Sequence, residues 1–295
     1  MAGESHFMTL DDWKNAGEYF TIGPYSLFYR KNFADSDEVT LLLHGFPSSS
    51  FDYHKIWNGL GEKFPLVACD MIGYGFSAKP RKFTYTTFDQ ADLIEALVRK
   101  SGIKRVHILA HDYGNTITQE FLARIEEGLQ GFEIASICML NGALFPETHR
   151  PVLTQKILIS PLGFLFAKFI SDKKFARSFS AIFGKDTKPA KEEMTDFLTV
   201  FKYNDGKSIA HKLIRYMRER KIYRERWVGP LQRTKIPFRF INGLDDPVSG
   251  AHLVKRFREI MPQTDIVELP GIGHYPHFEC PEKVLRLYFE FREKV

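Results

Sequence analysis

Residues 106–114 read Val-His-Ile-Leu-Ala-His-Asp-Tyr-Gly, which is a short run typical of a buried strand followed by a polar turn. Apolar residues then recur at helical spacing over residues 117–125. A tight strand-to-helix turn that presents a nucleophile needs small residues two positions before and after the central one, and Ala110 and Gly114 meet this need. The pattern therefore predicts Asp112 as a nucleophile at the turn. The alternative is that Asp112 only caps the helix.

An acid and a histidine follow the turn in the chain order that such a site requires. Asp246 stands in Gly-Leu-Asp-Asp-Pro-Val and His274 in Gly-Ile-Gly-His, each just after a predicted strand. Asp245 is the neighbouring alternative for the acid. We therefore predict that Asp112, Asp246 and His274 act together.

A turn upstream completes the pattern. His-Gly-Phe-Pro at residues 44–47 follows a predicted strand, and it presents the backbone N–H of Phe46. Together with the backbone N–H of Tyr113, this group would form an oxyanion hole. These four motifs, each directly after a predicted strand, favour a single reaction site.

The chain alternates buried strands and helices, which is typical of a mostly parallel sheet flanked by helices. Between about residues 146 and 228 the sequence becomes Phe-rich, basic and helical, and strand character returns only afterwards. We predict an α/β core formed by residues 1–145 and 229–295, with an inserted helical cap at 146–228. The predicted strands are 39–43, 66–69, 106–110, 134–140, 237–242 and 265–269, and a closing helix begins near residue 284.

Composition excludes several classes of protein. The 295 residues are 44% hydrophobic and 26% charged, which excludes a disordered or collagen-like chain. Cys69, Cys138 and Cys280 are odd in number and far apart, so neither a disulfide framework nor a cysteine zinc site is expected. Residues 1–14 show no targeting pattern, and we expect a cytoplasmic protein.

The net charge of +5 arises from one segment. Residues 168–226 carry 16 Lys or Arg and 8 Asp or Glu. The densest stretch, residues 215–226, interleaves acids with bases, which predicts a solvated helix with i,i+4 ion pairs. An anionic membrane surface is the second interpretation, supported by the apolar but Pro- and Gly-broken run at residues 157–170, which is too short to span a bilayer. We expect no nucleic-acid partner.

Two other motifs do not predict cofactors. Residues 73–78 match Gly-x-Gly-x-x-Ala, but Lys-Pro-Arg follows at once, and so no helix N-terminus is available for a pyrophosphate. His274 and His277 have metal-pair spacing, but Pro276 lies between them and no third ligand is nearby in sequence. We therefore expect neither a cofactor nor a metal.

The chain resembles α/β-hydrolases of the epoxide hydrolase and haloalkane dehalogenase branch, whose nucleophile is an aspartate. Within this branch it is most similar to the mesoderm-specific transcript family. The motifs that carry the resemblance are His-Gly-Phe-Pro (44–47), His-Asp-Tyr-Gly (111–114), Asn-Gly (141–142), Phe-Pro-Glu-Thr-His-Arg-Pro (145–151), Arg-Trp-Val-Gly (226–229), Asp-Pro-Val (246–248) and His-Tyr-Pro (274–276). The resemblance implies an α/β-hydrolase fold and a small apolar substrate.

An aspartate nucleophile implies attack at a saturated carbon and an alkyl-enzyme ester. The resemblance to epoxide hydrolases implies cap tyrosines that protonate the ring oxygen, and Tyr223 matches one such position, with packing as its alternative role. The other position corresponds to Phe197, while Tyr203 and Tyr216 are reserve candidates. Dehalogenases resemble one another in placing Trp after the nucleophile, where this chain has Tyr113, so halide binding is disfavoured. A non-catalytic ligand-binding protein is the alternative from another class.

Overall fold

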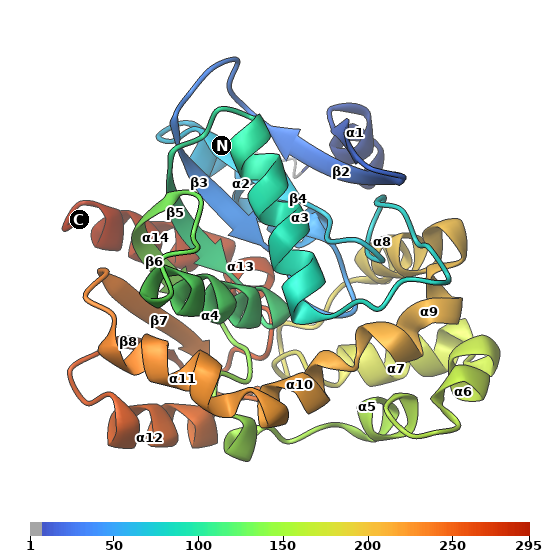
Figure 1. The fold of residues 1–295 in the computed structure, drawn as a ribbon. Coiled ribbons are helices and arrows are strands. Elements are labelled where there is room, and N and C mark those ends of the chain that lie inside the picture. Colours follow the sequence, from blue (N-terminus) through green and yellow to red (C-terminus); the bar gives the residue numbers. More distant parts are fainter. Residues whose placement is uncertain (1–7) are drawn as a thin grey trace, which may run out of the picture.

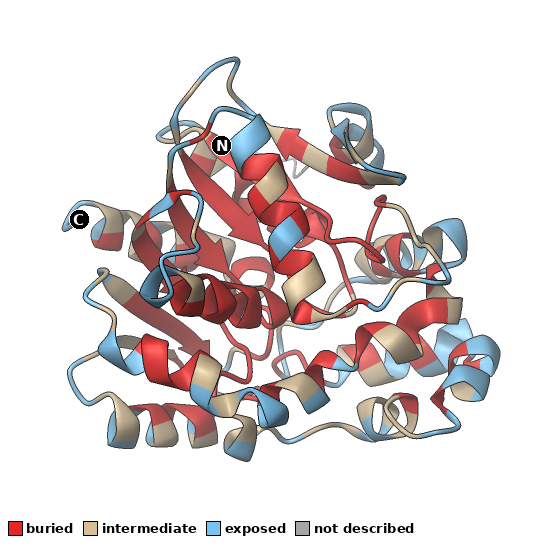
Figure 2. Cartoon of the chain, viewed as in Figure 1, coloured by how far each residue is buried: buried red, intermediate tan, exposed pale blue. Residues whose placement is uncertain are grey.

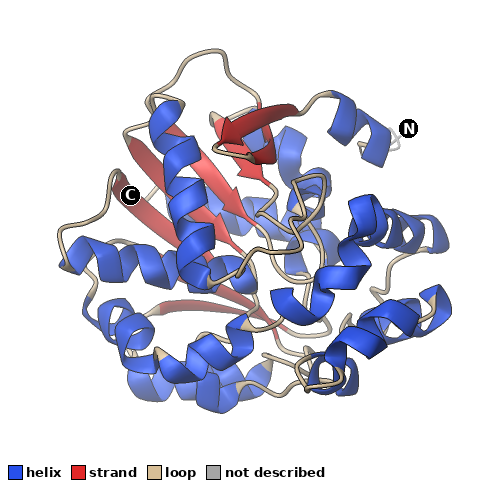
Figure 3. Cartoon of the chain, turned by 45° about the vertical axis from the view of Figure 1, so that its right-hand side comes forward, coloured by secondary structure: helices blue, strands red, loops and turns tan. Residues whose placement is uncertain are grey.

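The computed structural model describes residues 8–295 and contains an eight-stranded sheet of order β1-β2-β4-β3-β5-β6-β7-β8 (Figures 1 and 3). Residues 1–7 lie outside the described residues. The prediction that residues 1–14 carry no targeting pattern falls partly on them. Strands β3 to β8 run parallel to one another, while β2 pairs antiparallel with both β4 and the edge strand β1.

The six parallel strands occur where the sequence predicts them. Strands β3 to β7 are largely buried on both faces, as continuous apolar runs in a covered parallel sheet require, whereas the edge strand β8 is only partly buried (Figure 2). Their bounds are β3 (Glu38–Leu43), β4 (Leu66–Cys69), β5 (Arg105–Ala110), β6 (Glu133–Met139), β7 (Phe238–Gly243) and β8 (Asp265–Leu269). The hairpin of β1 (Glu18–Ile22) and β2 (Tyr25–Lys31) was not predicted.

Helices cover both faces of the sheet. One apolar layer joins the sheet to α3 (Thr87–Lys100), α4 (Tyr113–Glu126) and α12 (Ala251–Ile260). The other joins it to α1 (Leu10–Asn15), α2 (His54–Gly61) and α14 (Pro281–Arg292). The short helix α13 (Pro276–Glu279) precedes α14. The predicted α/β-hydrolase architecture is confirmed.

Seven helices lie between β6 and β7 in the chain; α5 to α9 gather beside one end of the sheet, whereas α11 lies against α4 (Figure 1). They are α5 (Leu153–Leu158), α6 (Gly163–Phe169), α7 (Asp172–Ser180), α8 (Lys191–Lys202), α9 (Gly206–Leu213), α10 (Tyr216–Ile222) and α11 (Arg224–Arg233). The last of them packs on α4, where Glu120 accepts from Arg226 Nε at 2.8 Å and from Trp227 Nε1 at 2.9 Å. Helix α11 thus crosses the predicted boundary at residue 228. The division into core and cap stays a prediction.

The prediction of one solvated, self-paired helix at residues 215–226 is wrong. The chain breaks at Tyr223 into α10 and α11. Its arginines pair with distant acids instead: Arg224 binds Glu147, and Arg226 binds Glu120 and Glu127. The arginines of this segment therefore form ion pairs that link α11 to α4 and to the segment at Glu147.

Candidate active site

Asp112 lies at the sharp turn between β5 and α4. Its backbone has φ 44° and ψ −101°, a conformation that costs energy for a side chain other than glycine and is typical of functional sites. A Cβ on Gly114 would lie 2.3 Å from the carbonyl oxygen of Leu43, so the turn needs glycine there. Although Asp112 occupies the N-cap position, its side chain makes no capping hydrogen bond. The carboxylate is therefore free for other chemistry.

The loops after β7 and β8 bring Asp246 and His274 together. His274 Nδ1 donates to Asp246 Oδ2 at 2.7 Å, and the same oxygen accepts from Ser249 Oγ at 2.6 Å and Asn141 Nδ2 at 3.0 Å. Both side chains are buried. Asp245 is exposed and accepts a hydrogen bond from the Gly271 N–H. The geometry thus pairs His274 with Asp246 and not with Asp245.

Charge couples the pair to Asp112. Burial alone would lower the pKa of His274, but the Asp246 carboxylate, and to a smaller extent Asp112, raise it above its usual value. Burial alone would raise the pKa of Asp112, but the positive charges of Arg220 and then His274 lower it. Asp112 is therefore an anion over the physiological pH range.

The predicted oxyanion donors flank the nucleophile. The backbone N–H of Phe46 donates to Asp112 Oδ2 at 3.1 Å. Tyr113 opens α4, and an amide in the first turn of a helix has no acceptor within that helix. The Phe46 N–H thus contacts the Asp112 carboxylate, while the role of the Tyr113 N–H as the second donor stays a prediction.

Among the candidate cap tyrosines, the structure brings Tyr216 to Asp112 and not Tyr223. Tyr216 is fully buried, and its ring stacks on Tyr113 with centroids 4.4 Å apart. Its pKa is raised well above the usual value, first by burial and then by the charge of Asp112. Its hydroxyl forms no hydrogen bond of standard geometry within residues 8–295.

The structure places Tyr223, the predicted lid acid, at the protein surface. Tyr223 is 37% exposed, and its ring packs edge-on against Phe88, at 5.0 Å, and beside Trp227. Tyr203 packs on Phe76 at the other end of the cap. Phe197, expected at the second lid position, lies in a buried aromatic cluster. Tyr216, a reserve candidate, is thus the tyrosine that fits.

Arg220 was missed by the sequence analysis. One helical turn after Tyr216, it is only 2% exposed, and its Nη2 lies 3.0 Å from the backbone oxygen of Asp112 and 3.6 Å from Oδ1. The available signal was the i,i+4 spacing from Tyr216, which places both residues on one face of α10.

A cavity of about 60 Å³ runs from His274 and Phe46 into the cap. Its walls are mostly apolar, with Thr154, Gln155 and Ser178 as polar members, and they come from the cap helices and the neighbouring loops. They include Val152, Leu158, Ala167, Ile170, Phe175, Phe179, Ile182 and Phe201. Such a lining suits an apolar ligand.

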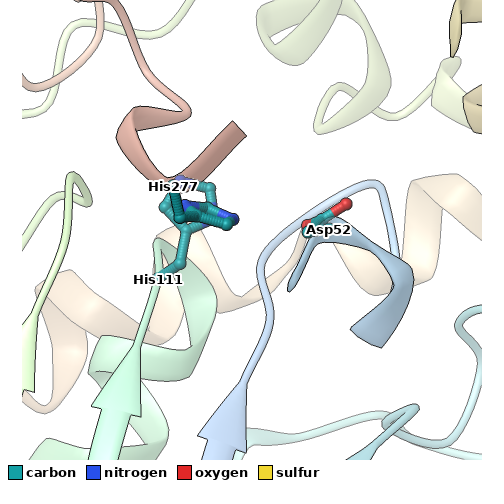
Figure 4. Close-up of side chains that lie close together, drawn as sticks. All are labelled: Asp52, His111 and His277. Carbon is teal, nitrogen blue, oxygen red and sulfur yellow. The ribbon is translucent and has the colours of Figure 1, made fainter. Parts of the chain in front are cut away.

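A second polar cluster lies behind the turn (Figure 4). One potential ligand atom from each of Asp52, His111 and His277 lies within 4.8 Å of the others, and all three residues are buried. His111 Nε2 is hydrogen-bonded to the His274 backbone oxygen at 2.8 Å, and burial lowers the pKa of His111 to about 3. Burial raises the pKa of Asp52 well above its usual value, which favours the neutral acid. The cluster supports the backbone of His274, and His277 belongs to it.

Comparison with known proteins agrees with this geometry. A family model described as alpha/beta hydrolase fold matches residues 39–281. The mesoderm-specific transcript homolog protein of Bos taurus is 39% identical, over 96% of this chain and 87% of that protein. LipZ of Mycobacterium tuberculosis, which is named as a hydrolase, is 37% identical over 92% of this chain and 93% of its own length. The crystal structure of the haloalkane dehalogenase DbeA from Bradyrhizobium elkani superposes with a TM-score of 0.77 at 20% identity, covering 95% of this chain and 99% of that one, and shares the fold.

The sheet order, the strand-to-helix turn and the family match define an α/β-hydrolase-fold protein. Within that class, the chain belongs to the mesoderm-specific transcript family, to which it is similar over nearly its whole length.

Proposed function

We propose that this protein is an epoxide hydrolase-like enzyme that acts through an ester on Asp112. The fold and the hydrolase-named relatives support a hydrolase. The observation that carries the finer proposal is the pairing of an aspartate, in place of serine, at the turn with the buried hydroxyl of Tyr216 beside it. A carboxylate that attacked an ordinary ester would give a labile anhydride, whereas attack on a saturated carbon gives a stable ester.

In the first step, one Asp112 oxygen attacks an epoxide carbon, the C–O bond breaks, and the ring oxygen takes the proton of Tyr216. The charge of Asp112 helps to keep the pKa of Tyr216 high in the free enzyme. That charge disappears as the ester forms, so Tyr216 becomes a stronger acid at the moment when the proton is needed.

In the second step, His274 removes a proton from water, and the hydroxide attacks the carbonyl carbon of the Asp112 ester. Asp246 holds the ring of His274 and stabilises its positive charge. The N–H groups of Phe46 and Tyr113 receive the oxyanion. Collapse of the intermediate releases a diol and restores Asp112, and the proton held by His274 returns through water to the Tyr216 phenolate.

Dehalogenation of an alkyl halide is the second candidate reaction, because the first covalent step is the same. It is favoured by the likeness of the fold to haloalkane dehalogenases. The residue after the nucleophile argues against dehalogenation, because this position holds Tyr113 where dehalogenases place Trp. The Tyr113 hydroxyl lies 3.3 Å from Thr87 Oγ1 in a buried contact. The apolar cavity suits a small apolar substrate in either case.

The test is intact mass spectrometry of His274→Gln after incubation with matched epoxides and alkyl halides. Without the base, the ester on Asp112 should accumulate. An epoxide adds its whole mass, a halide adds only its alkyl group, and a peptide map should place the adduct on residues 110–114. Asp112→Asn in the same background is the control, and it should give no adduct. Absence of an adduct from every compound would favour the non-catalytic ligand-binding alternative.

We also propose that the protein binds reversibly to anionic membranes. Leu162, Phe164 and Phe169, at the α5–α6 turn and in α6, are 65%, 51% and 72% exposed. Basic residues of α6 and α7, including Lys168 and Lys173, lie close to them in sequence. Residues 8–295 contain no helix with the length and hydropathy needed to cross a bilayer. Such a surface suits contact with a membrane interface.

Vesicle co-sedimentation with phosphatidylserine-containing liposomes tests this second proposal. Binding at low ionic strength should fall as salt is added, and Phe164→Ser with Phe169→Ser should remove it. Tyr19, which is exposed at the sheet edge, offers a control as Tyr19→Ser. Binding that salt and the double substitution leave unchanged would contradict the proposal.

A further inference from the structure

Arg220 joins the cap to the nucleophile. Its Nε donates to Thr116 Oγ1 of helix α4 at 2.7 Å, and its Nη2 donates to the Asp112 backbone oxygen at 3.0 Å. Two of its three nitrogens thus fix the guanidinium in a buried position. These two hydrogen bonds hold the Arg220 side chain in one position.

The third nitrogen has no partner. Arg220 Nη1 is buried and makes no hydrogen bond with any residue from 8 to 295. A buried guanidinium usually has its donors satisfied, because an unmet donor costs free energy. The Tyr216 hydroxyl and His149 Nε2 are also buried and make no hydrogen bond of standard geometry within residues 8–295, although the Tyr216 side chain interacts with Asp112. Arg220 Nη1 is therefore a buried donor that can still receive an acceptor.

Arg220 and Tyr216 both lie beside Asp112. The guanidinium carbon of Arg220 lies 4.6 Å from the centre of the Tyr216 ring. Burial and, to a smaller extent, the charge of Arg220 lower the pKa of His149 to about 4, while the charge of Asp112 opposes them. The groups thus lie near the nucleophile, and His149 is neutral at physiological pH.

Building on the proposed attack by Asp112, we propose that Arg220 is a catalytic residue whose Nη1 binds the oxygen leaving the attacked carbon. The site would then select electrophiles with an oxygen leaving group, such as epoxides, over those with a halide. Nothing in the fold or the family match assigns this role.

The step balances in atoms and charge. An electron pair of Asp112 forms the new O–C bond, and the electrons of the broken C–O bond go to the ring oxygen, which takes the proton of Tyr216. Tyr216 becomes a phenolate next to Arg220, whose positive charge offsets it. Water later returns the proton. Before proton transfer is complete, Nη1 donates a hydrogen bond to the developing alkoxide.

The competing explanation is that Arg220 only positions Asp112 and keeps it ionised. The two explanations differ in their dependence on the leaving group. A large, polarisable iodide leaves with little help from a hydrogen bond, whereas an alkoxide needs it. A positioning role would slow the attack on both compounds equally.

The experiment measures the rate of adduct formation in the His274→Gln background, with a terminal epoxide and a primary iodide of the same chain length. Arg220→Gln should slow the epoxide reaction by about 100-fold or more and the iodide reaction by about 10-fold or less. Arg215→Gln removes the same charge from an exposed position just before α10 and is the control, with both rates unchanged.

Each outcome decides something. Equal slowing of both compounds, or a greater loss with the iodide, would overturn the role of Arg220 while leaving the ester mechanism intact. No adduct from either compound in the parent background would overturn the proposed function and this role with it. If Arg220→Gln fails to fold in a thermal melt, Arg220→Lys keeps the charge, and an unchanged epoxide-to-iodide ratio in that variant would overturn the proposal.

Discussion

Tyr216→Phe removes one oxygen atom from the buried end of the cap, and it offers a sharp test of the proposed first step. The ring stays stacked on Tyr113, because Phe fills the same space. The lost hydroxyl interacts with Asp112 but makes no hydrogen bond of standard geometry within residues 8–295, so the free energy of unfolding should change by about 1 kcal/mol or less. The effect on the reaction should be far larger than the effect on stability.

A general acid contributes roughly 10²- to 10⁴-fold to a rate. This range corresponds to about 3 to 5 kcal/mol of activation free energy. We expect Tyr216→Phe to slow ester formation from an epoxide by a factor within that range. Hydrolysis of an ester that has already formed should proceed at the parent rate, since the second step uses His274 and not Tyr216.

The assay is rapid quenching followed by intact mass spectrometry, with His274→Gln as the parent for the first step. Tyr223→Phe is the matched control, because Tyr223 is partly exposed and packs on Phe88. It should react at the parent rate. Ester formation in Tyr216→Phe at close to the parent rate, or a slow Tyr223→Phe, would refute the assignment of the acid.

Other predictions concern the remaining parts of the site and its support. Asp246→Asn should reduce turnover about 10⁴-fold through loss of ring orientation, while Asp245→Asn should have little effect in the same steady-state assay; the reverse order would show that the wrong acid was chosen. Hydrolysis of the ester should rise with pH as His274 loses its proton, and Asp246→Asn should shift the midpoint of this pH profile downward, because the carboxylate is a main cause of the raised pKa of His274; an upward shift would contradict this. Glu120→Gln should lower the free energy of unfolding by about 1.5–3 kcal/mol, measured by urea denaturation, because a neutral amide replaces the buried carboxylate that accepts from Arg124, Arg226 and Trp227; an unchanged midpoint would show that this link between α4 and α11 contributes little.

The fold could be predicted because its signals are local. Each parallel strand is a short, continuous apolar run that ends at a polar loop, and the residues between strands have helical spacing. The β1–β2 hairpin was not predicted, because β1 lies at the sheet edge and is largely exposed, with Glu18, Tyr19 and Thr21 facing solvent. An edge strand carries little of the apolar signal that marks a buried one.

The site could be predicted only where backbone turns define it. Asp112, Asp246 and His274 stand in short motifs after strands, so their order in the chain was enough. The positions of the cap residues depend instead on how the helices pack. Tyr216 and Arg220 become buried because α10 turns one face toward Asp112, and a charged, alternating sequence does not reveal which face that is. Packing between distant elements decided this part of the site.

The central claim is that an oxygen of Asp112 passes into the product, and a single turnover in ¹⁸O-labelled water tests it most directly. With enzyme in excess over an epoxide, the diol from the first turnover should contain no ¹⁸O, and the peptide that contains Asp112 should gain the label. Water that attacked the substrate directly would place ¹⁸O in the diol and leave the peptide unlabelled, and this result would contradict the ester mechanism.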